Sequence, residues 1–193
     1  MNNPKVKIKS IQNLSSDWYK LDKVNFDYQT KSGQWQNQNR ECYDRGDGAA
    51  ILLYNKVKKT VILTQQFRMP SYLNGNNDGM MIEICAGLLD ENDPITCIKN
   101  EAEEETGYKI NNPVKVFEIY SSPGAVTEKI HYFIAEYSDE MKISDGGGLD
   151  EETEEIEVLE VSFHKALTMI SAGEIKDAKT IILLQYAKIN NLL

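Results

Sequence analysis

Residues 86–108 read Ala-Gly-Leu-Leu-Asp-Glu-Asn-Asp-Pro-Ile-Thr-Cys-Ile-Lys-Asn-Glu-Ala-Glu-Glu-Glu-Thr-Gly-Tyr and carry the clearest helix pattern in the chain. Asp93 is a favoured N-cap residue, and Pro94 follows at the first helical position, where its missing N–H costs nothing. Gly107 is placed to end the helix in a left-handed conformation. Four residues recur at spacings of three and four and predict one buried stripe: Ile95, Ile98, Ala102 and Thr106. We therefore predict a helix over residues 93–107.

The same helix carries three glutamates that neighbour one another on its surface. Glu101, Glu104 and Glu105 stand at i, i+3 and i+4. Like charges so arranged destabilise an isolated helix by roughly a few tenths of a kcal/mol per pair, and the C-terminal half of the helix dipole disfavours anions. Bound divalent cations would offset both costs, and carboxylates without histidine favour Mg²⁺ or Mn²⁺. The alternative is an ordinary solvated charge run, the commoner outcome for acidic segments.

Segments on both sides of this helix show strand and helix patterns. Before it, strand patterns occupy residues of about 5–13, 18–28, 34–44, 49–54, 60–67 and 80–85. After it come strand patterns at about 114–121, 129–137 and 155–161, and helices at 162–172 and about 177–190. We predict an α/β fold in which helices cover both faces of a mixed sheet, an α/β/α sandwich. A boundary near Gly46 separates an N-terminal antiparallel β extension, residues 1–45, from the main domain, residues 46–193.

The composition of the 193 residues excludes several classes of protein. The net charge is −9, from 30 acidic and 21 basic side chains, whereas a nucleic-acid-binding surface needs a basic footprint. No apolar run is long enough to span a bilayer, and the N-terminus lacks the apolar core of a secretory signal. The three cysteines have no paired spacing, which is typical of a reduced cytoplasmic protein. We expect a cytoplasmic protein without nucleic-acid or membrane partners.

Residues 86–108 resemble the Nudix box, the loop–helix–loop signature of the Nudix hydrolase superfamily. The box opens on a glycine and ends in Arg-Glu, an aliphatic residue, any residue, Glu-Glu, any residue and Gly. Five positions match this pattern: Gly87, Glu101, Glu104, Glu105 and Gly107. The chain departs from the pattern in three ways. The stretch from the first glycine to Glu101 is one residue short, and Asp93 stands near the position of the pattern's first glutamate. Asn100 replaces the arginine. The resemblance implies the Nudix α/β/α sandwich.

Segments outside the box extend the resemblance. Pro123 stands sixteen residues after Gly107, a spacing similar to that of the ADP-ribose pyrophosphatase branch of the superfamily. Nearly the whole chain, including the extension, looks more like the bacterial GDP-mannose pyrophosphatases of that branch. Segments that carry this likeness include Ala49-Ala-Ile-Leu-Leu-Tyr-Asn, Gln66-Phe-Arg, Cys85-Ala-Gly-Leu-Leu-Asp and Phe133-Ile-Ala-Glu-Tyr-Ser-Asp. The resemblance implies Mg²⁺-dependent hydrolysis of the pyrophosphate bond of a nucleoside diphosphate sugar, GDP-mannose to GMP and mannose 1-phosphate. It also implies a domain-swapped homodimer, in which each extension helps to build the partner's substrate site.

The resemblance assigns a metal site and the catalytic residues around it. It implies that Mg²⁺, with Mn²⁺ as a substitute, is held by the backbone carbonyl of Ala86 and by Glu101 and Glu105. Glu104 belongs to the same catalytic set. Glu154 resembles the distant loop carboxylate that completes the site.

The loop that carries Glu154 lies in a second acidic cluster, residues 150–157. Glu151 and Glu157 are alternatives for the same position. The residues leave open which of them is a metal ligand and which a general base. Three glycines, residues 146–148, precede the cluster and would let the loop swing over substrate.

An acidic chain needs cations to bind a diphosphate. Arg68 and Lys179 match positions that contact the nucleotide sugar in the resembling enzymes, and arginine suits bidentate phosphate binding. The alternative for each is a surface cation or a salt-bridge partner. The other residues that the resemblance implies at the substrate are Tyr19, Asn39, Arg40, Glu41, Ala86, Gly87, Leu88, Glu105, Glu128 and Glu154.

Three other functions fit parts of the pattern. Hydrolysis of ADP-ribose fits the Pro123 spacing equally well. A Nudix-fold binding or regulatory module without catalysis is favoured by Asn100, and an acidic interaction domain is the third alternative. The three glutamates of the box favour an enzyme over both non-catalytic functions.

Overall fold

The computed structural model describes residues 3–149 and 155–193, and the chain divides into two compact units. The first unit comprises the chain up to Asp47 together with Tyr120–Lys129. The second unit comprises Gly48–Ile119 and Ile130–Leu193. The sequence pattern did not predict that Tyr120–Lys129, far away in the chain, belongs with the N-terminal extension.

The first unit is a three-stranded antiparallel sheet in the order β1-β2-β3. Its strands are β1 (Val6–Ser15), β2 (Lys20–Gln29) and β3 (Trp35–Asp44). Ile8 pairs with Phe26 and Ile11 pairs with Val24, so apolar side chains gather on one face. None of the described residues up to Asp47 is buried. The sheet therefore has no core of its own.

A loop within Tyr120–Lys129 is joined to the end of β3 by backbone hydrogen bonds. The amide of Tyr43 donates to the carbonyl of Ala125 at 2.8 Å, and the amide of Thr127 donates to the carbonyl of Tyr43 at 3.0 Å. The Thr127 hydroxyl also donates to the Asp44 carboxylate at 2.9 Å. These bonds make the loop part of the first unit.

The second unit is built on a mixed seven-stranded sheet in the order β10-β5-β4-β9-β8, with β6 paired to β5 and β7 paired to β4. Its strands are β4 (Gly48–Asn55), β5 (Thr60–Phe67), β6 (Met80–Glu83), β7 (Cys85–Leu88), β8 (Val114–Tyr120), β9 (Lys129–Glu136) and β10 (Glu157–Ser162). Its helices are α1 (Met69–Leu73), α2 (Pro94–Thr106), η1 (Asp139–Met141), α3 (Phe163–Ala172) and α4 (Ala178–Ile189). Strands β4 and β9 run parallel, whereas β5 and β7 run antiparallel to β4.

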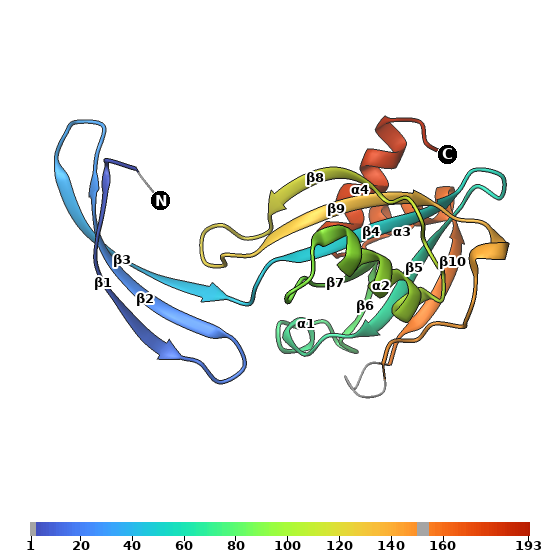
Figure 1. Cartoon of the computed structure of the whole chain (residues 1–193), viewed down its shortest axis with the longest axis horizontal. Helices are drawn as coiled ribbons and strands as arrows, with labels where there is room; N and C mark the ends of the chain where they lie inside the picture. Colours follow the sequence, from blue (N-terminus) through green and yellow to red (C-terminus); the bar gives the residue numbers. More distant parts are fainter. Residues whose placement is uncertain (1–2, 150–154) are drawn as a thin grey trace. The chain divides into compact units, whose positions relative to one another are not determined.

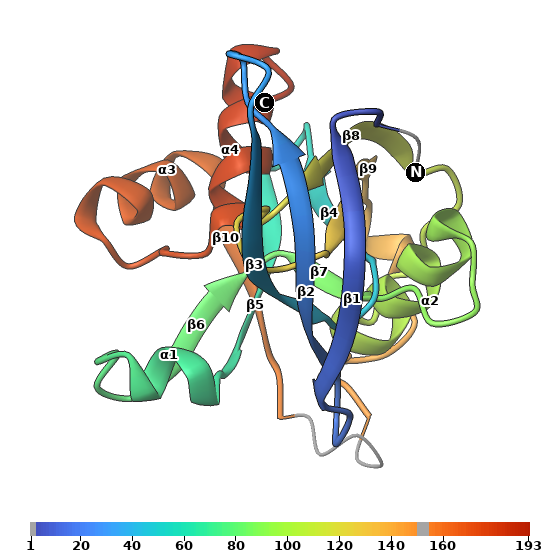
Figure 2. The same ribbon diagram turned by 90° about the vertical axis from the view of Figure 1, so that its left-hand side faces the viewer.

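The central strand β4 divides the core into two halves. Every residue of β4 is buried, and its side chains alternate between the two faces of the sheet. Ala50 and Leu52 pack in a cluster with residues of α3 and α4, whereas Ile51 and Leu53 pack in a cluster with residues of α2. Helix α2 therefore lies on one face, and α3 and α4 lie on the other (Figures 1 and 2). The predicted α/β/α sandwich is confirmed.

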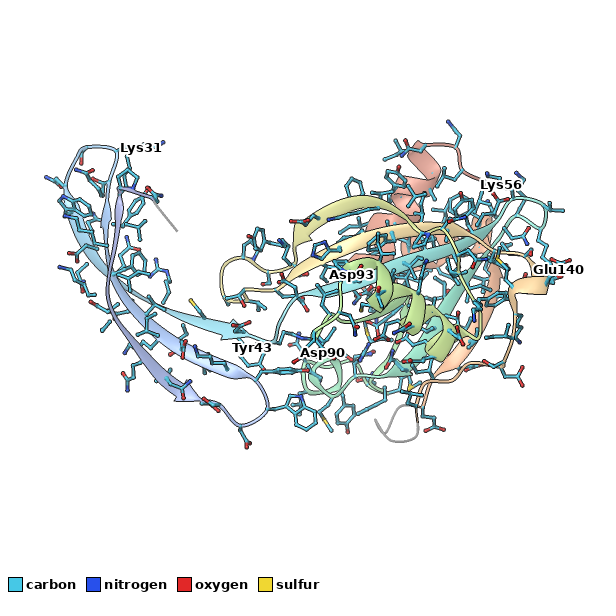
Figure 3. The ribbon with its side chains drawn as sticks, viewed as in Figure 1. Lys31, Tyr43, Lys56, Asp90, Asp93 and Glu140 are labelled. Carbon is cyan, nitrogen blue, oxygen red and sulfur yellow. The ribbon has the colours of Figure 1, made fainter. Side chains whose placement is uncertain are left out.

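Helix α2 begins and ends as its sequence predicts. The Asp93 side chain accepts from the amides of Ile95 at 3.0 Å and Thr96 at 3.2 Å, and it lies at the N-terminal end of the helix (Figure 3). Gly107 ends the helix with φ of 77°. The prediction that Ile95 belongs to the buried stripe is wrong, because its side chain is 48% exposed in the first turn. Cys97, near the start of α2, and Glu105, near its end on the side that faces β7, are buried although the predicted stripe contained neither.

Two elements between β5 and α2 were not predicted. The five-residue helix α1 has no side-chain cap, so no capping pattern marks it. The apolar run at residues 80–85 is two strands rather than one, because the amide of Ile84 donates to the hydroxyl of Thr180 on α4, at 2.8 Å. Across residues 3–149 and 155–193, no helix is long and apolar enough to cross a membrane.

Candidate active site

The backbone of β7 lies directly against a carboxylate of α2. A Cβ atom built on Gly87 would fall 1.9 Å from Oε1 of Glu101. Only glycine leaves room for this approach, which explains the opening glycine of the box. Gly87 and Leu88, both half-buried, are held in β7 by antiparallel pairing with β4.

A second carboxylate of α2 reaches the same strand. The amide of Ala86 donates to Oε2 of Glu105 at 3.3 Å, and Glu105 is only 2% exposed. Burial, and next the charges of Glu105 and Glu101, raise the pKa of the Cys85 thiol well above its usual value. Ala86, Glu101 and Glu105 are therefore brought together at an acidic junction.

The donors at this junction suit a hard cation. The Ala86 carbonyl and two carboxylates offer only oxygen, which is the ligand preferred by Mg²⁺ and Mn²⁺. Within the part of the chain that the structure describes, no group of three or more His, Cys, Asp or Glu side chains is arranged to hold a metal ion. Two protein carboxylates and a backbone carbonyl still fit Mg²⁺, which usually keeps several waters and takes few protein ligands.

The remaining predicted carboxylates are placed differently. Glu104 is exposed on α2, one position before the buried Glu105. Glu157 is exposed at the start of β10, where it pairs in register with Gln65. Glu154 and its alternative Glu151 lie outside the described residues.

The three glycines after η1 close the C-terminal end of α2. The amides of Gly147 and Gly148 donate to the carbonyls of Glu105 and Glu104, at 3.0 and 3.2 Å. A Cβ on Gly146 would lie 2.5 Å from the Glu105 carbonyl oxygen. We call residues 146–148 the glycine clip. The sequence suggested a hinge here, whereas the described glycines are bound to the helix that carries the box glutamates.

Both predicted phosphate-binding cations meet at one buried glutamate. Glu83, 5% exposed on β6, accepts from Nε of Arg68 at 2.8 Å and from Nζ of Lys179 at 3.2 Å. Lys179 also pairs with Asp177 at 2.7 Å. Burial lowers the pKa of Lys179, but the charges of Glu83 and Asp177 outweigh burial and the pKa lies above its usual value. The salt-bridge alternative for Arg68 and Lys179 is thus observed, although each cation keeps further N–H groups.

Two substrate candidates in the first unit lie close together. The Arg45 guanidinium lies 5.5 Å from the ring centroid of Tyr19 and 3.5 Å from the carboxylate of Glu128. Tyr19 also packs edge-to-face on Tyr43, with 5.9 Å between centroids. Arg45 therefore links the loop that carries Glu128 to the ring of Tyr19.

The other three candidates follow one another on β3. Asn39 and Glu41 point to one face of the sheet and Arg40 to the other, because side chains alternate along a strand. Asn39 accepts a hydrogen bond from Asn25 at 3.0 Å, and Arg40 donates to Gln38 at 3.0 Å. These three side chains do not converge on a single point of their sheet.

Comparison with known proteins agrees with this geometry. The model of the NUDIX domain matches residues 44–183, which include the junction of β7 and α2. The chain belongs to the Nudix family. The model described as the GDP-mannose pyrophosphatase NudK N-terminal domain matches residues 5–43, the three-stranded sheet.

Curated relatives match most of the chain. A GDP-mannose pyrophosphatase of Yersinia pestis is 54% identical over 187 residues, which is 96% of this chain and 93% of the relative. The GDP-mannose pyrophosphatase of Pectobacterium atrosepticum is 55% identical over 174 residues, 90% of this chain and 89% of the relative. The predicted membership of the Nudix superfamily is confirmed.

Two residues that contact the predicted site residues, Glu83 and Arg45, were not found from the sequence. Glu83 is a lone charge inside an apolar run, between Ile82 and Ile84, and that pattern could have marked it as a paired buried group. Arg45 had no such pattern, because its partners Tyr19 and Glu128 are distant in the chain.

Proposed function

We propose that this chain hydrolyses the pyrophosphate bond of GDP-mannose to GMP and mannose 1-phosphate in a reaction that requires Mg²⁺. The observation that carries the proposal is the junction of β7 and α2. One carboxylate lies against Gly87 there, and a second is buried beside Ala86. The relatives that are 54% identical over nearly the whole chain are GDP-mannose pyrophosphatases, which supports this choice of substrate.

The metal site in this proposal consists of the Ala86 carbonyl, Glu101 and Glu105. Nudix hydrolases generally use divalent metal ions, and these oxygen donors suit Mg²⁺, with Mn²⁺ as a substitute. When bound, such an ion lowers the pKa of water and neutralises charge on phosphoryl oxygens. Glu104 and Glu154 are proposed as further catalytic carboxylates on sequence resemblance.

The chain's own cations and backbone would bind the rest of the substrate. Arg68 and Lys179 are proposed to contact the diphosphate, since both contact Glu83, three residues before Ala86, and both retain N–H donors. Gly87 and Leu88 are proposed to contact it through their backbone. In the first unit, the proposed contacts are Tyr19, Asn39, Arg40, Glu41 and Glu128.

The extension, residues 1–45, is proposed to mediate a homodimer in which it completes the substrate site of the partner's domain, residues 46–193. The apolar face of its sheet supports this proposal, because Ile8 is 51% exposed and Ile11 is 58% exposed. A small sheet without buried residues gains stability when its apolar face is covered. Sedimentation equilibrium at micromolar concentration should give twice the chain mass, and a monomer would exclude the swapped dimer.

The cytoplasm is the proposed location. Cys42, Cys85 and Cys97 are free thiols, and free thiols persist in reducing compartments. Differential alkylation in freshly lysed cells should show that all three thiols are reduced.

A panel of substrates tests the proposed reaction. The value of kcat/KM should be highest for GDP-mannose among GDP-mannose, GDP-glucose, ADP-ribose and nucleoside triphosphates. A chelator should abolish turnover, and Mg²⁺ should restore it. Preference for ADP-ribose would overturn the choice of substrate. Absence of turnover of every diphosphate, with Mg²⁺ or with Mn²⁺, would overturn the assignment of an enzyme.

A further inference from the structure

We propose that Glu83 is a positioning residue, which holds Arg68 and Lys179 in the orientation that binds the substrate's diphosphate. This inference rests on the proposed function. The Glu83 side chain divides its two oxygens between the two cations, with Oε2 at 2.8 Å from Nε of Arg68 and Oε1 at 3.2 Å from Nζ of Lys179. The carboxylate therefore links a residue that follows β5 to a residue of α4.

The backbone around Glu83 is fixed from both neighbouring elements. Its carbonyl accepts from the hydroxyl of Thr64 on β5 at 3.3 Å. The next amide, that of Ile84, donates at 2.8 Å to Thr180, whose hydroxyl donates at 2.7 Å to Asp177 at the start of α4. A carboxylate on such a rigid segment holds its partners in one geometry rather than following them.

Each cation keeps donors for a ligand. Glu83 engages Arg68 only through Nε, and neither terminal nitrogen of Arg68 bonds to a residue that the structure describes. Those two nitrogens form the planar fork that binds phosphate oxygens in pairs. Lys179 has three N–H donors and gives one each to Glu83 and Asp177. The Arg68 side chain is 42% exposed, so its outer end is open to solvent.

Glu83 also lies close in the chain to the proposed metal site. Ala86, whose carbonyl is the proposed metal ligand, lies three residues further along the same segment, about 10 Å in an extended chain. The diphosphate-binding cations and the metal-binding carbonyl are thus anchored to one short piece of backbone. Correct spacing between metal and cations is what in-line attack on a phosphoanhydride needs.

A purely stabilising ion cluster predicts different behaviour, and a double-mutant cycle separates the two. Glu83→Gln keeps the shape but can no longer accept from both cations, so kcat/KM should fall at least about tenfold. In a variant that already carries Arg68→Ala and Lys179→Ala, adding Glu83→Gln should change kcat/KM by less than about twofold. An equal fall in both backgrounds would overturn the proposal, because Glu83 would then act without the two cations.

Glu160→Gln is the control for a lost ion pair at a more exposed position of the same sheet. Glu160 likewise joins several partners: Lys58 at 3.2 Å, the hydroxyl of Thr60 at 3.0 Å and the hydroxyl of Tyr137 at 2.9 Å. Its removal should leave kcat/KM within about twofold of wild type. A fall as large as that of Glu83→Gln would show a general effect of lost ion pairs and would overturn the proposal.

Glu83→Asp covers the case in which Glu83→Gln does not fold. Aspartate keeps the charge but withdraws the carboxylate by one methylene, so a folded Glu83→Asp enzyme should still lose kcat/KM by about fivefold or more. Full activity of this variant would overturn the positioning role.

All variants are assayed with the diphosphate sugar that the wild type hydrolyses best, so a wrong sugar leaves the test intact. Absence of any wild-type turnover would overturn the proposed function together with this inference. An active wild type with fully active Glu83 variants would overturn this inference alone.

Discussion

The amide of Gly147 donates a hydrogen bond to the carbonyl of Glu105 at 3.0 Å, and this bond joins the glycine clip to the helix of the box. The last carbonyls of a helix have no partner within the helix. Here the clip supplies partners for two of them, those of Glu104 and Glu105. The proposed metal ligand Glu105 is thus held by its backbone from the C-terminal side of α2 and by its carboxylate at Ala86.

Alanine at Gly146 should loosen this clip. The position has φ of 70°, and an added Cβ would lie 2.5 Å from the backbone oxygen of Glu105. We expect Gly146→Ala to lower the free energy of unfolding by about 2–4 kcal/mol, measured by urea denaturation, and to lower turnover.

Gly173→Ala is the control for this variant. Gly173 has nearly the same φ, 74°, but no atom lies within 4 Å of an added Cβ. Gly173→Ala should therefore lower the free energy of unfolding only by the cost of placing alanine at a positive φ, about 1 kcal/mol. An equal loss of unfolding free energy in the two variants would show that the contact between Gly146 and helix α2 does not contribute to stability.

Glu105→Gln should separate activity from stability. The change removes one ligand charge, so turnover with Mg²⁺ should fall at least about 100-fold. It also removes the like-charge contact with Glu101 one turn earlier, so the metal-free melting temperature should equal or exceed that of wild type. An activity assay measures the first effect, and thermal shift with and without Mg²⁺ measures the second. Wild-type turnover, or stabilisation by Mg²⁺ as large as in wild type, would move the metal site elsewhere.

Gly87→Ala should impair catalysis with little loss of stability. Its Cβ would displace the Glu101 carboxylate, which lies 1.9 Å from that point. The displaced atoms are the end of a flexible side chain, so the unfolding free energy should change by less than about 1 kcal/mol. We expect kcat/KM to fall at least about tenfold, because Glu101 leaves its position. An unchanged kcat/KM would show that Glu101 does not act from beside Gly87.

Cys97 should make the fold sensitive to alkaline pH. Burial, and next the charge of Glu101, raises the pKa of the Cys97 thiol to about 12. The unfolded thiol ionises near its usual pKa of about 8.5, so only the unfolded state loses this proton between those values. Stability contributed by the neutral thiol is therefore complete below about pH 8.5 and declines as pH rises towards 12. Between about pH 9 and 10.5 the free energy of unfolding should fall more in the wild type than in Cys97→Ala. The same pH dependence of stability in both proteins would contradict the raised pKa of Cys97.

Features governed by local sequence were predictable. The limits of α2 follow from Asp93, Pro94 and Gly107, because caps act within one turn of the residue that forms them. The strand β4 and its hairpin partner β5 follow from short runs of buried residues. The box glutamates were identified for the same reason, since i, i+3 and i+4 positions are neighbours on any helix.

Features that depend on contacts between distant segments were not predictable. The interactions of Glu83 come from Arg68, which follows β5, and from Lys179 on α4, and both are distant from Glu83 in the sequence. The glycine clip is recognisable only once residues 146–148 lie on the end of α2. Ile95 was misassigned because the start of α2 buries Cys97 instead, where its thiol meets the carbonyl of Leu88 on β7 at 3.2 Å.

The most direct test of the account is ³¹P NMR of GDP-mannose incubated with the protein and Mg²⁺. Cleavage of the pyrophosphate should replace the two diphosphate resonances with two monophosphate resonances of equal intensity, those of GMP and mannose 1-phosphate. The same sample with excess chelator, or with Glu105→Gln, should show the unchanged diphosphate. Release of GDP and mannose, or an unchanged spectrum with folded protein and Mg²⁺, would contradict the proposed cleavage at the junction of β7 and α2.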